Sequence, residues 1–379
     1  MNKLKMLSFL LIFLSIQISA SAQKKASVDL PMKMRGLMPA VEVIVNGKGP
    51  FLFAIDTGAQ GLARIDSSLV KQLGLKVSGQ AQASDGSGQN SRTLDTVKLD
   101  SIKVGDVEFR EVEVITRDYN TSPNLPKIDG ILGFDLFAEY LLTLDFPAKR
   151  VRVESGELPK ANEANIISFE NPNGIAIVEL LVGNQKVKAH IDSGNLVGGF
   201  ILPTTVVEKS NLASQPVVVG RARTVSNEVE IKQVRLKDTI RLGSFEFTEP
   251  TVSFPALSNA NIGALMMQNF VLTFDQKNKR VKLEKAKVAE TKPSVQIENQ
   301  KDYVGIYGER TISDESGNLY IQRKGGMKFR LVAVAKDEFT LEQAPNARVK
   351  FVRDTRGKVS EIEVLNPAGA IEKAKREQP

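Results

Sequence analysis

Residues 51–60 read FLFAIDTGAQ, and a related stretch, VKAHIDSGN, occupies residues 187–195. In each stretch an apolar run typical of a strand ends in an aspartate, a hydroxyl residue and a glycine. The triplets are Asp56-Thr57-Gly58 and Asp192-Ser193-Gly194. Average composition predicts on the order of 0.2 such triplets by chance in a chain of this length. Two of them, each closing a similar strand, therefore indicate a shared structural role.

The sequence that follows each triplet also repeats. Residues 128–154 read IDGILGFDLFAEYLLTLDFPAKRVRVE, and residues 261–284 read NIGALMMQNFVLTFDQKNKRVKLE. Gly133 aligns with Gly263 at an offset of 130 residues, whereas the two triplet aspartates lie 136 residues apart. The chain thus contains a duplication with small changes of length, and each half supplies one aspartate.

The first residues have the pattern of an export signal. Lys3 and Lys5 precede an apolar run over residues 6–18, and small residues end at Ala22. This pattern predicts a signal peptide over residues 1–22. The pattern fits a membrane anchor less well, because the apolar run is shorter than the roughly 20 residues that are needed to span a bilayer. We expect a periplasmic or extracellular protein with no stable membrane insertion after cleavage.

Composition excludes several kinds of chemistry. The 379 residues include no cysteine and one histidine, His190, so a cysteine nucleophile is excluded and a zinc site or a serine triad is disfavoured. The net charge of +7 comes from scattered basic residues, and tryptophan is absent, so nucleic-acid binding has little support. Carboxylates remain as the acid and base groups, and no metal or cofactor is predicted.

Turn and cap signals predict short elements around each triplet. Asn46-Gly47 predicts a hairpin between strands at residues 37–44 and 51–56. Asp66 and Gly74 are typical of the start and end of a helix. In the second half, residues 205–208 (TVVE) fit a capping box at a helix start.

The polar, glycine-rich residues 78–91 (SGQAQASDGSGQNS) leave two interpretations open. They form either a surface loop or a hairpin tip that folds over a substrate. On the second interpretation, Ser84, Asp85 and Gly86 are candidate substrate-binding residues.

Two polar segments divide the chain. Residues 155–165 and 285–300 contain proline and many charged or amide residues, and they are typical of linkers. They separate lobes at residues 28–155 and 166–286 from a third region at residues 300–375. Short alternating runs in that third region predict a small antiparallel β domain.

Two carboxyl groups on symmetric loops suit hydrolysis of an unreactive bond. When they lie a few ångströms apart, they cannot both ionise cheaply, so they share one proton. One group can then deprotonate a water while the other protonates the substrate oxygen.

The triplet loops, together with the downstream segment Ile131-Leu132-Gly133 and its looser copy at Asn261, resemble pepsin-type and retropepsin-like aspartic peptidases. The resemblance covers roughly residues 41–284. It implies an all-β fold of two pseudo-symmetric lobes, here with the small antiparallel β domain appended, and a cleft that binds extended polypeptide. It further implies the following roles: Asp56 and Asp192 as the catalytic dyad, Thr57 and Ser193 as hydroxyl braces, and Gly58 and Gly194 as supporting loop residues.

The leading hypothesis is therefore an exported, monomeric aspartic endopeptidase acting on polypeptide. The alternative is a catalytically silent lobe pair that binds peptide or protein. It is motivated by Asn195, where pepsins commonly carry serine or threonine, by Ala59, and by the lack of a clear flap tyrosine in residues 78–91. A purely structural β protein, with each aspartate capping a turn, leaves the paired triplets unexplained.

Overall fold

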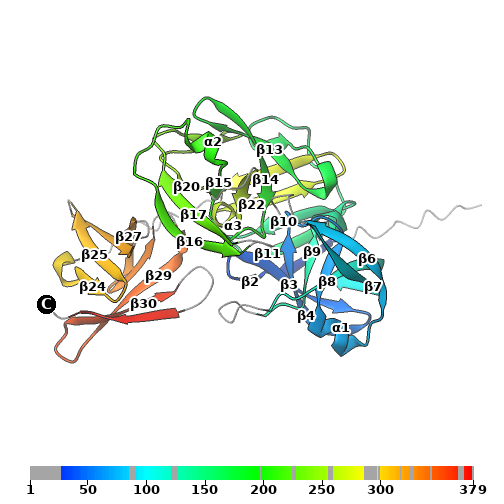
Figure 1. Ribbon diagram of the computed structural model, residues 1–379, viewed down its shortest axis with the longest axis horizontal. Coiled ribbons are helices and arrows are strands. Elements are labelled where there is room, and N and C mark those ends of the chain that lie inside the picture. Colours follow the sequence, from blue (N-terminus) through cyan, green and yellow to red (C-terminus); the bar gives the residue numbers. More distant parts are fainter. Residues whose placement is uncertain are drawn as a thin grey trace, which may run out of the picture.

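The computed structural model is all-β and is built from four sheets (Figure 1). It describes residues 27–84, 91–120, 127–196, 198–223, 228–254, 259–285, 297, 299–315, 317–324, 328–341, 344–365 and 371–377. The predicted fold class is confirmed. The predicted signal peptide and the candidates Asp85 and Gly86 lie outside these residues.

The first lobe is an eight-stranded sheet in the order β2-β3-β4-β9-β5-β8-β7-β6. Its strands are β2 (Lys33–Arg35), β3 (Met38–Val45), β4 (Lys48–Asp56), β5 (Ala63–Asp66), β6 (Val77–Ser84), β7 (Ser91–Val104), β8 (Val107–Arg117) and β9 (Gly130–Gly133). The helix α1 (Ser67–Leu73) follows β5, and the 3-10 helix η1 (Phe134–Phe137) follows β9.

The local signals of the first lobe form as the sequence predicts. Asn46 and Gly47 turn β3 into β4 with φ angles of 48° and 73°, and glycine favours this left-handed region. Asp66 caps α1 by accepting a hydrogen bond from the Ser68 amide at 3.0 Å. Gly74 ends the helix with φ 66°. These contacts fix the frame that carries β4 and its terminal aspartate.

The second lobe is a nine-stranded sheet in the order β16-β17-β20-β15-β21-β14-β13-β18-β19. Its strands are β13 (Ile177–Val182), β14 (Gln185–Asp192), β15 (Phe200–Ile201), β16 (Val217–Arg223), β17 (Glu228–Arg235), β18 (Ile240–Leu242), β19 (Phe245–Phe247), β20 (Thr251–Ser253) and β21 (Ala260–Gly263). The short helices are η2 (Pro172–Gly174), α2 (Thr204–Val207) and α3 (Ala264–Met267).

The predicted capping box at residues 205–208 is wrong. Helix α2 already begins at Thr204, and Pro203 takes the cap position without a side-chain hydrogen bond. Because the helix starts two residues earlier than the pattern requires, Thr205 lies inside its first turn and cannot cap it.

A third sheet joins the two halves. It has the order β1-β11-β10-β22-β23-β12, with β1 (Ser27–Pro31), β10 (Leu141–Asp145), β11 (Arg150–Glu154), β12 (Ile166–Ser168), β22 (Phe270–Asp275) and β23 (Arg280–Lys285). The closing hairpin of each half, β10–β11 or β22–β23, does not pair with the sheet of its own lobe. Instead β10 pairs with β22 across the molecule, and Thr143 lies directly opposite Thr273.

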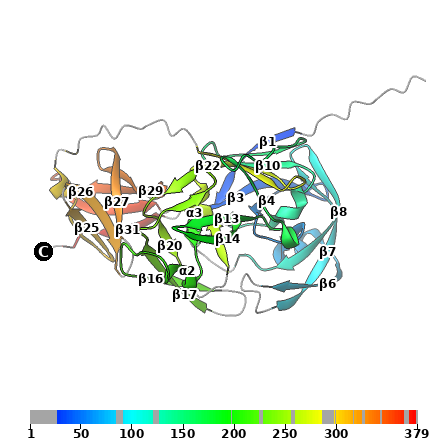
Figure 2. The same ribbon diagram turned by 90° about the horizontal axis from the view of Figure 1, so that it is seen from above.

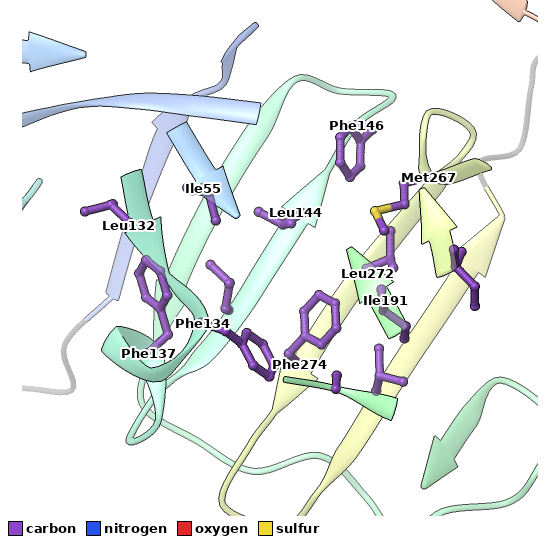
Figure 3. Close-up of a cluster of buried hydrophobic side chains, with 14 of the residues drawn as sticks. Ile55, Leu132, Phe134, Phe137, Leu144, Phe146, Ile191, Met267, Leu272 and Phe274 are labelled. Atoms are coloured by element: carbon purple, nitrogen blue, oxygen red, sulfur yellow. The ribbon is translucent and has the colours of Figure 1, made fainter. Parts of the chain in front are cut away.

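One continuous core underlies both lobes and the joining sheet. Figure 3 shows Ile55 and Ile191, the residues before the two aspartates, contributed from opposite sides of this core. Between them lie side chains of the joining sheet and of the segments after the glycine motifs, among them Phe134, Leu144 and Phe274. Burial of these apolar side chains fixes the ends of β4 and β14 relative to each other.

The C-terminal sheet is an antiparallel meander with a separate core. Its strands are β24 (Gly305–Tyr307), β25 (Arg310–Glu315), β26 (Asn318–Arg323), β27 (Lys328–Ala335), β28 (Glu338–Leu341), β29 (Ala344–Arg353), β30 (Val359–Leu365) and β31 (Ile371–Lys375), preceded by the 3-10 helix η3 (Gln300–Asp302). A bridge between Tyr307 and Arg376 brings the first strand back to the last. The meander lies beside the second lobe, away from the first (Figures 1 and 2).

None of the helices in the described ranges has the length and apolar character that crossing a membrane requires.

Candidate active site

Each triplet lies at the end of a central strand. The parallel neighbour of that strand ends in the repeated glycine, Gly133 in the first lobe and Gly263 in the second. Strand β4 pairs with β9 so that Asp56 lies opposite Gly133, and β14 pairs with β21 so that Asp192 lies opposite Gly263. After each aspartate the chain turns sharply. The Phe134 amide then donates to the Ala59 carbonyl at 3.2 Å, and the Ala264 amide donates to the Asn195 carbonyl at 2.9 Å. The two loops are therefore built on the same plan.

Thr57 and Ser193 connect the two loops through four buried hydrogen bonds. The Thr57 hydroxyl donates to the Ile191 carbonyl at 2.8 Å and accepts from the Ser193 amide at 3.0 Å. Reciprocally, the Ser193 hydroxyl donates to the Ile55 carbonyl at 2.8 Å and accepts from the Thr57 amide at 3.0 Å. Both side chains are fully buried. This reciprocal set fixes the spacing of the two adjacent aspartates.

The loop glycines bring each carboxyl group against the opposite loop. A Cβ atom on Gly58 would lie within 2.6 Å of every heavy atom of the Asp192 carboxyl group. A Cβ atom on Gly194 would lie within 2.5 Å of every heavy atom of the Asp56 carboxyl group. Each aspartate also accepts a 2.9 Å hydrogen bond from the glycine amide of its own loop. Only glycine permits this approach.

The two carboxyl groups are close enough to interact directly, and their environment favours the protonated form. Burial, followed by the charge of Asp192, raises the pKa of Asp56 to about 7. Burial likewise raises the pKa of Asp192, although hydrogen bonds to its carboxylate oppose the shift. Such a pair retains one proton over a wide range of pH, which supplies an acid and a base at the same place.

Three polar residues near the dyad were not predicted as site residues. Arg64 on β5 lowers the pKa of Asp56 through its positive charge, but less than burial raises it. The pKa of Tyr119, in the loop after β8, is raised mainly by burial and further by the charge of Asp56. Its side chain packs beside an apolar cluster that includes Ala54, Ala59 and Ile131. Asn261 donates from Nδ2 to Asp192 Oδ2 at 2.8 Å. The sequence did offer one sign of this contact, because Asn261 stands where the first copy of the repeat has the apolar Ile131.

Of the remaining candidates, only Ser84 lies within the described residues. Ser84 is the last residue of β6, which pairs with β7. Strands β16 and β17 form the corresponding hairpin of the second lobe, and both hairpins lie along the same side of the molecule (Figure 2).

His190 lies two residues before Asp192 on β14, is half-buried, and has a pKa lowered by burial. Among the described residues, no cluster of three or more possible metal ligands occurs.

Residues 41–136 match the sequence model of a family described as aspartyl protease. The match includes Asp56, the α1 region and the segment of Gly133. This match confirms the predicted resemblance to aspartic peptidases over residues 41–136, and it supports a protease-like function. Comparison with curated proteins gave no match.

Substitution of Thr57 by valine is expected to destabilise the protein by about 2–4 kcal/mol, because it leaves the Ser193 amide and the Ile191 carbonyl buried without this partner. The measurement is urea denaturation. Thr57→Ser is the matched control, since it keeps the hydroxyl. A valine variant as stable as the serine variant would contradict the bracing role.

Proposed function

We propose that the protein is an aspartic endopeptidase that hydrolyses peptide bonds with a water activated by Asp56 and Asp192. The observation that carries this proposal is the reciprocal hydrogen bonding of Thr57 and Ser193, which holds two carboxyl groups together at the ends of symmetric strands. A structural role for either aspartate alone would not require the second.

The chemistry needs one ionised and one protonated carboxyl group. The carboxylate takes a proton from water as the water oxygen bonds to the peptide carbonyl carbon, and the carboxylic acid protonates the carbonyl oxygen. In the tetrahedral gem-diol that results, the newly protonated aspartate gives its proton to the nitrogen, and the other aspartate takes a proton from one hydroxyl group. The carbon–nitrogen bond breaks, and the single proton of the dyad is again on the aspartate that held it at the start. Two polypeptide ends leave, and no cofactor is consumed.

The substrate that we propose is polypeptide. The two hairpins on one side of the lobes, β6–β7 and β16–β17, suit an extended chain bound between the lobes. We further propose that the signal at residues 1–22 exports the protein to the periplasm or beyond, that it acts as a monomer, and that its domains follow the boundaries 28–155, 166–286 and 300–375.

Cleavage of a denatured protein mixture between about pH 3 and pH 8 tests this function. We expect activity to fall as the pH rises through about 7, because Asp56 then loses the proton that the substrate oxygen needs. A chelator should leave the rate unchanged. Abolition by the chelator, or activity that keeps rising above pH 8, would contradict the dyad mechanism.

The second candidate is a lobe pair that binds peptide without cleaving it. Ala59 favours it, because this position in the first loop offers no hydroxyl to the dyad. A folded protein that binds denatured polypeptide but cleaves none at any pH would establish this alternative.

A further inference from the structure

The two aspartates differ in the hydrogen bonds that they accept from neighbouring residues. Asp192 accepts from the Gly194 amide at Oδ1 and from the Asn261 side chain at Oδ2, where Nδ2 lies 2.8 Å away. Asp56 accepts the equivalent amide hydrogen bond from Gly58. Both carboxyl groups thus accept from the glycine amide of their own loop. Asp192 also has a backbone hydrogen bond from Asn195, and Asn261 gives it a side-chain donor that no described residue outside the dyad gives Asp56.

The position that supplies the extra donor is apolar in the first lobe. Asn261 corresponds to Ile131 at the repeat offset of 130, and the strand pairing agrees: Ala54 lies opposite Ile131, and His190 lies opposite Asn261. The Ile131 side chain has no hydrogen-bond donor and packs in a buried apolar cluster. The difference between the two aspartates therefore follows from a sequence difference at equivalent positions of the repeat, Ile131 and Asn261.

The orientation of the Asn261 side-chain amide indicates which ionisation state of Asp192 it stabilises. Its Oδ1 atom is buried and has no hydrogen-bond partner among the described residues. Reversing the amide would point two N–H donors at that same unpartnered side and would present an oxygen to the Asp192 carboxylate. Buried donors without acceptors are rarer than carbonyl oxygens without donors. The observed orientation suits an ionised Asp192.

The other charged and titratable groups around the dyad are few. Arg64 and Tyr119 act on Asp56, and Arg117 lies over the Tyr119 ring at 5.7 Å. Arg64 favours the ionised form of Asp56 and so opposes the bias from Asn261, yet the pKa of Asp56 remains raised. On the second-lobe side His190 precedes Asp192, and burial favours its neutral form.

We propose that Asn261 is a positioning residue that holds Asp192 as the ionised base and thereby makes Asp56 the proton donor. This inference rests on the proposed function. It assigns the direction of the reaction: Asp192 takes the proton of the attacking water, and Asp56 protonates the carbonyl oxygen of the peptide. The hydrogen bond to the charged oxygen is the source of the bias.

Asn261→Ile, which installs the residue of the first lobe, tests the proposal. We expect the acid limb of the pH–rate profile to move to higher pH, because Asp192 without this donor is protonated more easily. We also expect kcat to fall about tenfold with KM little changed, since a lost hydrogen bond to a charged group acts on the reacting carboxylate. Carboxyl ¹³C NMR titration of the folded protein measures Asp192 independently of activity.

The matched control is Asn278→Ala, because Asn278 Nδ2 also donates to a carboxylate, Asp275 Oδ2, at 2.9 Å and lies outside the dyad. It should leave the pH profile unchanged. Asn261→Ala serves if the isoleucine variant does not fold. The double variant Ile131→Asn/Asn261→Ile should reverse the order in which the two aspartates titrate.

The outcomes separate this inference from the proposed function. An active protein whose pH profile and Asp192 titration are unchanged by Asn261→Ile or Asn261→Ala overturns the role of Asn261 and leaves the peptidase standing. An inactive protein in which the Asp192 titration nevertheless moves to higher pH supports the role of Asn261 and removes the peptidase.

Discussion

Asp56→Asn should lower the rate of peptide cleavage by about 10³-fold or more, because an amide can neither donate nor accept the proton that the dyad transfers. The variant should still fold, since the Asn side chain keeps an oxygen for the Gly58 amide. Asp192→Asn should have an effect of the same order. The measurement is the rate of cleavage at the optimum pH of the unmodified protein.

Although Asp56→Asn should lower activity, it should raise the stability of the folded protein at alkaline pH. Because the pKa of Asp56 is raised from an ordinary value of 3.8 to about 7, the folded protein binds this proton more tightly than the unfolded chain. The resulting stability is present at low pH and is lost as the pH rises through about 7. Asparagine does not ionise, so at pH 8 the variant should be more stable than the unmodified protein by about 4 kcal/mol.

Urea denaturation at pH 5 and pH 8 measures this difference, and the exposed Asp100→Asn provides the control. The gain at pH 8 should shrink at pH 5, where Asp56 is already protonated. If Asp56→Asn instead destabilised the protein equally at both values, Asp56 would be a structural cap and not a member of a dyad.

Gly194→Ala should abolish most of the activity, with a loss of at least about 100-fold. The added methyl group would lie within 2.5 Å of the whole Asp56 carboxyl group, so either the carboxyl group or the loop must move. A displacement of about 1 Å at a reacting group is enough for a loss of this size. Overpacking should also cost about 1–3 kcal/mol of stability.

Gly199→Ala is the matched control for this prediction. Gly199 lies in the same loop region, but a Cβ atom there would have its nearest neighbour at 3.4 Å, which is ordinary contact. Activity and urea denaturation should be close to those of the unmodified protein. Full activity in Gly194→Ala would show that the two loops are not packed as closely as the dyad requires.

Much of this arrangement could be predicted from the sequence because it rests on local signals. The two triplets ended strands, Asn46-Gly47 made the hairpin, and Asp66 with Gly74 bounded the helix. Each of these depends on residues that are neighbours along the chain, so a short window contains the physical cause.

The features that could not be predicted depend on contacts between distant residues. Pairing of β10 with β22 joins Thr143 to Thr273, and alternation within either strand fits a closed lobe equally well. The Asn261 contact was visible only as an irregular residue in a repeat. The N-cap of α2 is Pro203, two residues before the cap position that the capping pattern predicted.

The pairing of β10 with β22 also bears on the origin of the chain. Thr143 and Thr273 are equivalent in the repeat, and they face each other with their hydroxyl oxygens 3.0 Å apart. A residue that meets its own counterpart lies on a two-fold axis, so this contact is isologous, as in a symmetric homodimer. A half-length ancestor could have assembled both loops by self-association. In a single chain the two copies can differ, as Ile131 and Asn261 do, and two identical subunits could not differ at one of these positions alone.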